Sequence, residues 1–214
     1  GSPSPNGGAT SVIGPLGVDP ATGNVGFDIA AQGDALATLS VGGSTGLYTI
    51  DLTTGAATLV GPIGGGNLDV VDLALPRPPR GALVGLAAGN VLLGFDAATP
   101  GTVTPRPITG LQPGETIVGI DVRPATGEVI GIGLTGTSGR VYRIDPATAV
   151  ATQLGTTPFV VAATAATTWS VDFNPTVDRI RFTNAAGDSY RVNPLTGGLA
   201  ATDTDIAPAT PSAI

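Results

Sequence analysis

Apolar and polar residues alternate in short runs along the chain, and a tight-turn signal separates the runs in pairs. In the clearest pair the turn begins at Asp51 and ends at Gly55, and the other turns have a related Asp/Asn-x-x-Thr pattern. The four pairs cover residues 47–61, 91–103, 141–155 and 189–201. A period of two residues is that of a β-strand, and an acidic or amide side chain before glycine provides the turn chemistry of a hairpin. The pattern therefore predicts four β-hairpins.

A second kind of segment precedes each hairpin and predicts two further short strands. These segments cover residues 25–39, 68–86, 117–133 and 169–183. The resulting unit of four strands occurs four times with a period of roughly 40 to 50 residues, which is typical of propeller blades. The first two strands of each unit are rich in small residues, so we expect them to lie next to the central channel. The pattern predicts an all-β fold, a β-propeller of about four four-stranded blades; a five-bladed or incomplete propeller, a β-sandwich and a β-solenoid are the alternatives.

The propeller is expected to occupy residues 9–206 as a single domain. Residues 9–14 resemble the outermost strand of a blade, and we expect them to pair into the last blade and close the ring. Residues 1–8 are typical of a tag remnant and linker, and residues 207–214 resemble a linker. The proline-rich residues 76–80 predict a stiff connection.

Composition removes several classes of function. The chain contains no Cys, no His and no Met, and all nine of its basic residues are Arg. A Ser-His-Asp or Cys-His hydrolase is therefore excluded, as are disulfides and thiolate metal sites. The net charge of −7 argues against nucleic acid or anionic membrane as a partner. No run of apolar residues is long enough to span a bilayer, so membrane insertion is not expected.

Two sets of residues recur at equivalent places in the repeat. The turn set is Asp51, Asp96, Asp145 and Asn193. These oxygens suit Ca²⁺, but each stands alone in its turn, which favours a turn-forming role. The inner-strand set is Asp28, Asp72, Asp121 and Asp172. Such carboxylates need partners if they are buried, so we expect them to accept hydrogen bonds from neighbouring blades; holding a cation in the channel is the alternative.

A third group combines the late arginines with the single tryptophan. Arg179, Arg181 and Arg191 lie close to acidic residues in the sequence, which favours ion pairs between blades over a site for a ligand carboxylate. Trp169 is the only candidate for an exposed aromatic platform, although a core position is favoured. Aromatic residues make up only 4% of the chain, which argues against a lectin.

Several segments carry a family resemblance. Residues 82–86, 92–101, 108–111, 119–127 and 172–181 resemble the opening of a bacterial domain of unknown function, family 4394. Residues 9–75 resemble the closing half of the family, and residues 82–206 resemble its opening half. The two halves therefore occur in the reverse order to that of the family. One hairpin unit of the family pattern is also missing. A natural or engineered circular permutation, a window across two tandem domains and a trimmed design all fit this order. The family occurs in exported bacterial proteins, which implies a secreted or cell-surface setting, and it has no established activity.

These observations favour a non-enzymatic extracellular binding or structural module with a protein partner and no cofactor. A calcium-binding or carbohydrate-binding surface domain and a permuted or engineered scaffold without activity are the alternatives. An enzyme would need a pair of carboxylates, and the only glutamates, Glu115 and Glu128, form no obvious pair with another acid. A ring with one unit missing either closes more tightly, as a monomer, or is completed by a second chain, as a dimer. We expect the monomer, and the dimer is the alternative.

Overall fold

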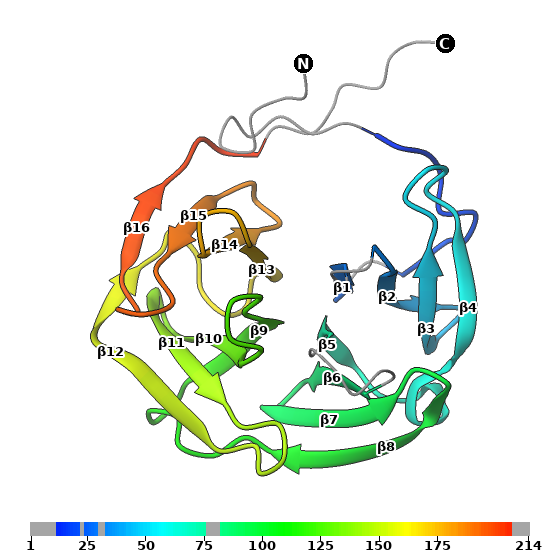
Figure 1. Cartoon of the computed structure of the whole chain (residues 1–214), viewed down its shortest axis with the longest axis horizontal. Helices are drawn as coiled ribbons and strands as arrows, with labels where there is room; N and C mark the ends of the chain where they lie inside the picture. Colours follow the sequence, from blue (N-terminus) through cyan, green and yellow to red (C-terminus); the bar gives the residue numbers. More distant parts are fainter. Residues whose placement is uncertain (1–11, 22–23, 30–32, 76–81, 207–214) are drawn as a thin grey trace.

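The protein is described by a computed structural model that covers residues 12–21, 24–29, 33–75 and 82–206. Within these residues, four antiparallel sheets of four strands each are arranged around a centre (Figure 1). The only helical element there is a single 3₁₀ turn, Ile63–Gly66. The predicted four-bladed propeller is therefore confirmed.

Each blade is built from consecutive strands, and the first strand of each blade lies nearest the centre (Figure 1). Blade 1 contains β1 (Gly26–Ile29), β2 (Ala35–Val41), β3 (Ser44–Ile50) and β4 (Ala57–Pro62). Blade 2 contains β5 (Val70–Ala74), β6 (Ala82–Ala87), β7 (Val91–Asp96) and β8 (Thr99–Pro107). Blade 3 contains β9 (Thr116–Val122), β10 (Val129–Thr135), β11 (Ser138–Ile144) and β12 (Ala151–Val160). Blade 4 contains β13 (Trp169–Asn174), β14 (Arg179–Asn184), β15 (Ser189–Val192) and β16 (Leu199–Thr202).

Turn chemistry fixes the register within a blade. Val41 pairs with Ser44, which leaves a two-residue turn of Gly42 and Gly43 between β2 and β3. Their φ angles are 60° and 82°. A two-residue hairpin turn with positive φ at both positions matches the twist of the strands, and glycine adopts it without steric cost.

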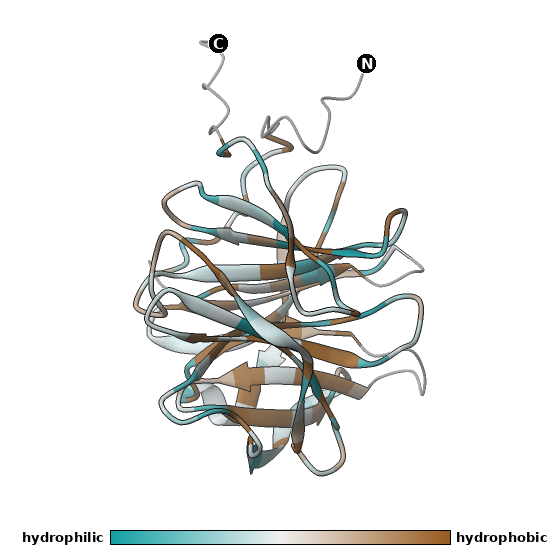
Figure 2. Ribbon diagram, turned by 90° about the vertical axis from the view of Figure 1, so that its left-hand side faces the viewer, coloured by the Kyte–Doolittle hydropathy of each residue, from teal (hydrophilic) through white to brown (hydrophobic). Residues whose placement is uncertain are grey.

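The core lies between successive blades rather than in one central cluster. Leu47 of blade 1 packs with Leu73 of blade 2, and further apolar clusters join blade 2 to blade 3 and blade 3 to blade 4. Hydrophobic residues gather in the strands, and the connecting loops are more hydrophilic (Figure 2). Burial of apolar side chains therefore stabilises each pair of neighbouring blades. In the described part of the chain, no helix has the length and apolar character required to cross a membrane.

The N-terminal segment lies on blade 1, not on the last blade. Residues 12–14 form no strand, and the Cα of Gly14 approaches the β3–β4 turn at Thr54 so closely that a side chain there would collide with it. Further along, the carbonyl of Leu16 accepts a hydrogen bond from the Ala57 amide at 2.8 Å, and Val18 packs against the apolar cluster of blade 1. The expected closure by residues 9–14 is therefore wrong for the described residues, because blade 4 has its own fourth strand and Val18 is needed to cover blade 1.

Other predicted segments lie outside the described residues. These are residues 9–11, the expected linkers at residues 1–8 and 207–214, and the proline-rich residues 76–80.

The ring has an open side between blade 4 and blade 1. The inner strands β1 and β5, β5 and β9, and β9 and β13 pack side by side. Among the described residues, β13 and β1 do not pack in the same way, and Figure 1 shows blades 4 and 1 spread apart. We call this sector the open side of the ring.

Candidate functional site

Three aspartates of the inner strands join neighbouring blades. One carboxylate oxygen of Asp28 accepts the backbone N–H of Leu75 at 2.7 Å. Asp72 accepts the N–H of Ile120 at 2.8 Å, and Asp121 accepts that of Phe173 at 2.6 Å. The second oxygen of each carboxylate accepts the N–H of the next residue in its own strand. Each side chain therefore ties two inner strands together, and we call these three residues the blade latches.

Asp172 occupies the fourth position of the inner-strand set but has a different environment. Its side chain is exposed, and within the described part of the chain it accepts no hydrogen bond from a further blade, because the open side of the ring comes next. Asp172 pairs in register with Arg181 of β14. The sequence repeat thus places four aspartates around the channel, and the structure gives only three of them a bridging role.

Burial shifts the protonation of these aspartates. It raises the pKa of Asp28 and raises that of Asp72 well above its usual range, although backbone N–H donors oppose both shifts. Burial, together with the nearby charges of Asp28 and Asp172, raises the pKa of Asp121 to about 9. Asp172 keeps contact with solvent, yet partial loss of hydration of its carboxyl group, and then the charge of Asp28, raise its pKa to about 6. Near neutral pH the channel therefore holds protons that free aspartates would release.

These carboxylates are not arranged as a cation site. Among the described residues, no three side chains of His, Cys, Asp or Glu are grouped so that they could hold a metal ion. The turn set is likewise engaged locally: Oδ1 of Asp51 accepts the amides of Thr53 and Thr54, and equivalent bonds are made by Asp96, Asp145 and Asn193. The turn residues therefore hold the hairpin turns in shape.

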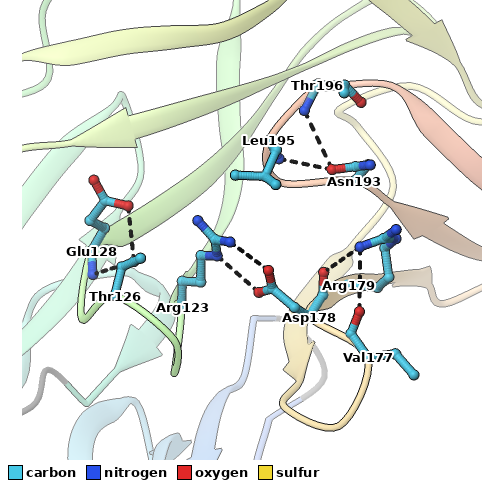
Figure 3. A network of polar contacts seen from close by, with 9 residues as sticks. All are labelled: Arg123, Thr126, Glu128, Val177, Asp178, Arg179, Asn193, Leu195 and Thr196. Carbon is cyan, nitrogen blue, oxygen red and sulfur yellow. Dashed lines mark hydrogen bonds and ion pairs between the residues drawn. The ribbon is translucent and has the colours of Figure 1, made fainter.

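A polar network crosses the loop face between blades 3 and 4 (Figure 3). Arg123, which comes directly after β9, donates from Nε to Oδ1 of Asp178 at 2.9 Å and from Nη2 to Oδ2. Asp178 lies in the β13–β14 turn with a positive φ of 49°. Arg179 donates to the backbone carbonyls of Val177 and Asp178, so its guanidinium stabilises the same turn.

Blade 4 presents a polar wall to the open side. Arg181 and Arg191 both form ion pairs with Asp203, each with an N–O distance of 2.8 Å. Asp203 comes directly after β16, and its side chain is almost fully buried. Asp172, Arg181, Arg191 and Asp203 make up what we call the blade-4 wall.

Blade 1 presents an apolar wall to the same side. Val25 lies directly before β1, and Phe27 and Ile29 follow at alternate positions in it; the three residues are 44%, 43% and 47% exposed. Alternate residues of a strand share one face, and the intervening Asp28 points to blade 2. Val25, Phe27 and Ile29 make up the blade-1 wall.

Trp169 lies in the core and offers no exposed platform. Only 4% of the residue is exposed, and its ring stacks on Phe182 with 4.2 Å between ring centroids. Its Nε1–H donates to the carbonyl of Thr164 at 2.9 Å. The interpretation as a surface platform is wrong for Trp169, because the ring fills the space between blades 3 and 4 and its one polar group is satisfied internally.

Comparison with known protein families identifies the family of this chain. Residues 2–74 and 91–213 match the family described as "Domain of unknown function (DUF4394)". The chain belongs to the DUF4394 family. The resemblance expected from the sequence is thus confirmed. No curated protein matches the chain.

Solved structures share the fold of this DUF4394 chain at low identity. A chain in the crystal structure of a nidogen/laminin complex has a TM-score of 0.54 and 13% identity, over 81% of this chain and 61% of that one. A structural genomics protein of unknown function from Bacteroides thetaiotaomicron has a TM-score of 0.55 and 11% identity, over 92% of this chain and 49% of that one. The DUF4394 chain therefore spans less than two thirds of either matched chain, and the similarity shows the fold alone.

Two buried acids of the DUF4394 chain were missed by reasoning from sequence. The side chain of Glu115 is fully buried, pairs with Arg140 at 2.6 Å and accepts a hydrogen bond from the Tyr142 hydroxyl. Burial, and secondarily Glu115, raises the pKa of Tyr142 to about 12. The second is Asp203 of the blade-4 wall. Neither acid belongs to the repeat, so the periodicity of the sequence does not point to them. Two local signals could have found them: Glu115 comes just before an apolar strand, and Asp203 comes just after a hairpin that contains an arginine.

Proposed function

We propose that this DUF4394 chain is a non-enzymatic module that binds another polypeptide at the open side of its ring, outside the bacterial cell. The observation that carries the proposal is the exposure of Phe27 and Ile29 on the inner strand β1 and of Val25 directly before it. Inner strands of a propeller are normally covered on both faces by neighbouring blades, and a contiguous exposed apolar surface is typical of a binding site. The occurrence of a similar fold in a nidogen/laminin complex is compatible with this role. The extracellular setting rests on the family resemblance alone.

The engagement of the acids supports a role without catalysis. Both oxygens of each blade latch accept backbone N–H groups. Glu115 is buried against Arg140. A glycosidase would need two opposed carboxyl groups with room for a sugar between them, and these acids already serve the fold. The turn set and the buried Trp169 likewise give no support to calcium or carbohydrate binding.

We further propose that the order of the family halves is rotated in this chain. The family match breaks between residues 74 and 91, where the expected closing half ends and the opening half begins. Propeller blades contact mainly their neighbours, so a change in chain order leaves most blade contacts intact.

The proposed function is tested by capture from the exported proteins of the source bacterium. The wild-type chain and the double variant Phe27→Ser, Ile29→Ser are immobilised side by side, with Leu195→Ser as a matched control at a 64% exposed residue of the β15–β16 turn. We expect a protein that is retained by the wild type and the control and is lost from the double variant. Retention of the same proteins by all three would contradict binding at the open side.

A further inference from the structure

We propose that the open side of the ring receives a β-hairpin of the propeller type that is carried by another polypeptide, with one apolar and one polar face. This inference rests on the proposed function and names the chemistry of the partner. It comes from comparing each wall with the equivalent surface of the other blades.

The blade-1 wall lacks the cover that equivalent residues have. Phe27 and Ile29 flank the inner-strand aspartate Asp28, as Val171 and Phe173 flank Asp172. In blade 4 these flanking residues pack against Ile130 and Ile132 of the preceding blade. Val171 and Phe173 are at most 5% exposed, whereas Phe27 and Ile29 are more than 40% exposed. The blade-1 wall is therefore an uncovered copy of an apolar blade interface.

Blade 4 does not supply that cover. The residues paired in register with the inner-strand aspartates are Leu36, Leu86, Ile130 and Arg181. The first three are buried apolar side chains, whereas Arg181 forms an ion pair with Asp203. Burying this charged pair against apolar residues would cost free energy. The two walls are thus unlike each other, and direct closure of the ring would place charges against apolar side chains.

The walls together define the chemistry of an occupant. One face of a hairpin would pack apolar side chains on the blade-1 wall, and its other face would place polar side chains on the blade-4 wall, because residues of a strand alternate between faces. Asp172 would accept a backbone N–H of the incoming strand, as the three blade latches do. Within the blade-4 wall the charges of Arg181 and Arg191 balance those of Asp172 and Asp203, so neutral polar side chains complement it.

The terminal segments of the chain itself lack the residues that this role requires. Residues 1–11 contain no large apolar residue, and residues 207–214 contain one, Ile214. Each segment also contains two prolines, which disfavour strand pairing. Neither of these two segments therefore fits the occupant that we propose.

Two matched peptides of residues 116–135 test the inference on the intact protein. This stretch forms the β9–β10 hairpin, whose Ile130 and Ile132 cover Val171 and Phe173 within the chain. The test peptide carries Ile120→Thr and Val122→Thr, which makes the opposite face polar. The control peptide carries Ile130→Thr and Ile132→Thr, which removes the covering face. Both are labelled with fluorescein, and binding is measured by fluorescence anisotropy.

We expect the test peptide to bind and the control peptide to bind at least about tenfold more weakly, which corresponds to about 1.4 kcal/mol. The double variant Phe27→Ser, Ile29→Ser should lose binding, Asp172→Ala should weaken it, and Leu195→Ser should leave it unchanged. Circular dichroism confirms that each variant is folded.

Equal binding of both peptides, or binding of neither, would overturn the inference. Self-association that the double variant abolishes would overturn it in favour of a second copy of the chain. If an exported protein is captured through Phe27 and Ile29 while neither peptide binds, the proposed function stands and only the hairpin chemistry fails.

Discussion

Arg123 and Asp178 form a two-point ion pair that connects the loop after β9 to the β13–β14 turn, and thereby blade 3 to blade 4 (Figure 3). The side chains are 10% and 30% exposed, so the pair is only partly screened by solvent. The Arg123 guanidinium also holds the pKa of Asp178 below its usual range. We expect a double-mutant cycle with Arg123→Ala and Asp178→Asn to give a coupling of about 1 kcal/mol in urea unfolding.

The pair Arg143–Glu128 provides the control for this cycle. Its N–O distance is 3.4 Å and its side chains are 51% and 35% exposed, so its coupling should be close to zero. Equal coupling in the two pairs would contradict a special role for the Arg123–Asp178 contact between blades.

The blade latches are predicted to stabilise the fold more than Asp172 does. Asp121→Ala leaves the buried amides of Phe173 and Val122 without their acceptor. Each such loss costs about 1–3 kcal/mol, so we expect the free energy of unfolding to fall by about 2–4 kcal/mol. Asp172→Ala, at the same repeat position, should change it by less than about 0.5 kcal/mol. Chemical denaturation of both variants measures the difference, and similar losses would refute the bridging role.

The raised pKa values predict greater stability in mild acid. A group whose folded pKa lies above its unfolded value binds more protons in the folded state, so stability is lost as pH rises between the two values. With the pKa of Asp121 at about 9 and that of Asp172 at about 6, the melting temperature should fall between pH 5 and pH 8. The Asp178 pKa is lowered, so its opposite effect is confined to lower pH. Asp121→Asn should reduce the slope, and a melting temperature that rises over this range would contradict the assignment.

The chain is predicted to be a monomer in isolation. The blade-1 wall consists of three partly exposed side chains, whereas a stable dimer interface needs about 800 Å² from each partner. Light scattering should give a single mass near 20.9 kDa at all concentrations. A mass that doubles with concentration would instead identify the wall as a contact between copies.

The blades were predictable because the information that builds them is local. Asp51 and Gly55 predict a turn through chemistry within five residues: the carboxylate accepts nearby amides, and glycine adopts a φ of 81°. Alternation then assigns the flanking residues to strands. The four-strand unit and its repetition can be read without knowledge of distant contacts.

The site was less predictable because its properties depend on whether another blade is packed against each inner strand. Asp121 and Asp172 occupy the same sequence context, yet only Asp121 has a neighbouring strand to bind. Ile29 and Phe173 are likewise equivalent in sequence and differ in exposure. The predicted position of the N-terminal segment was wrong for a related reason. Residues 9–14 resemble an outer strand in sequence, but the described part of the segment lies on blade 1, where Val18 packs against an apolar cluster.

Among the described residues, no strand from one end of the chain is built into the blade at the other end. In this part of the chain, no shared strand therefore connects the first blade to the last. A tensile load applied at the two ends of the described ring would therefore meet no interlocked strand. We expect blades 1 and 4 to detach first, with loss of the Asp28 and Asp121 contacts, and the Asp72 contact between blades 2 and 3 to break last.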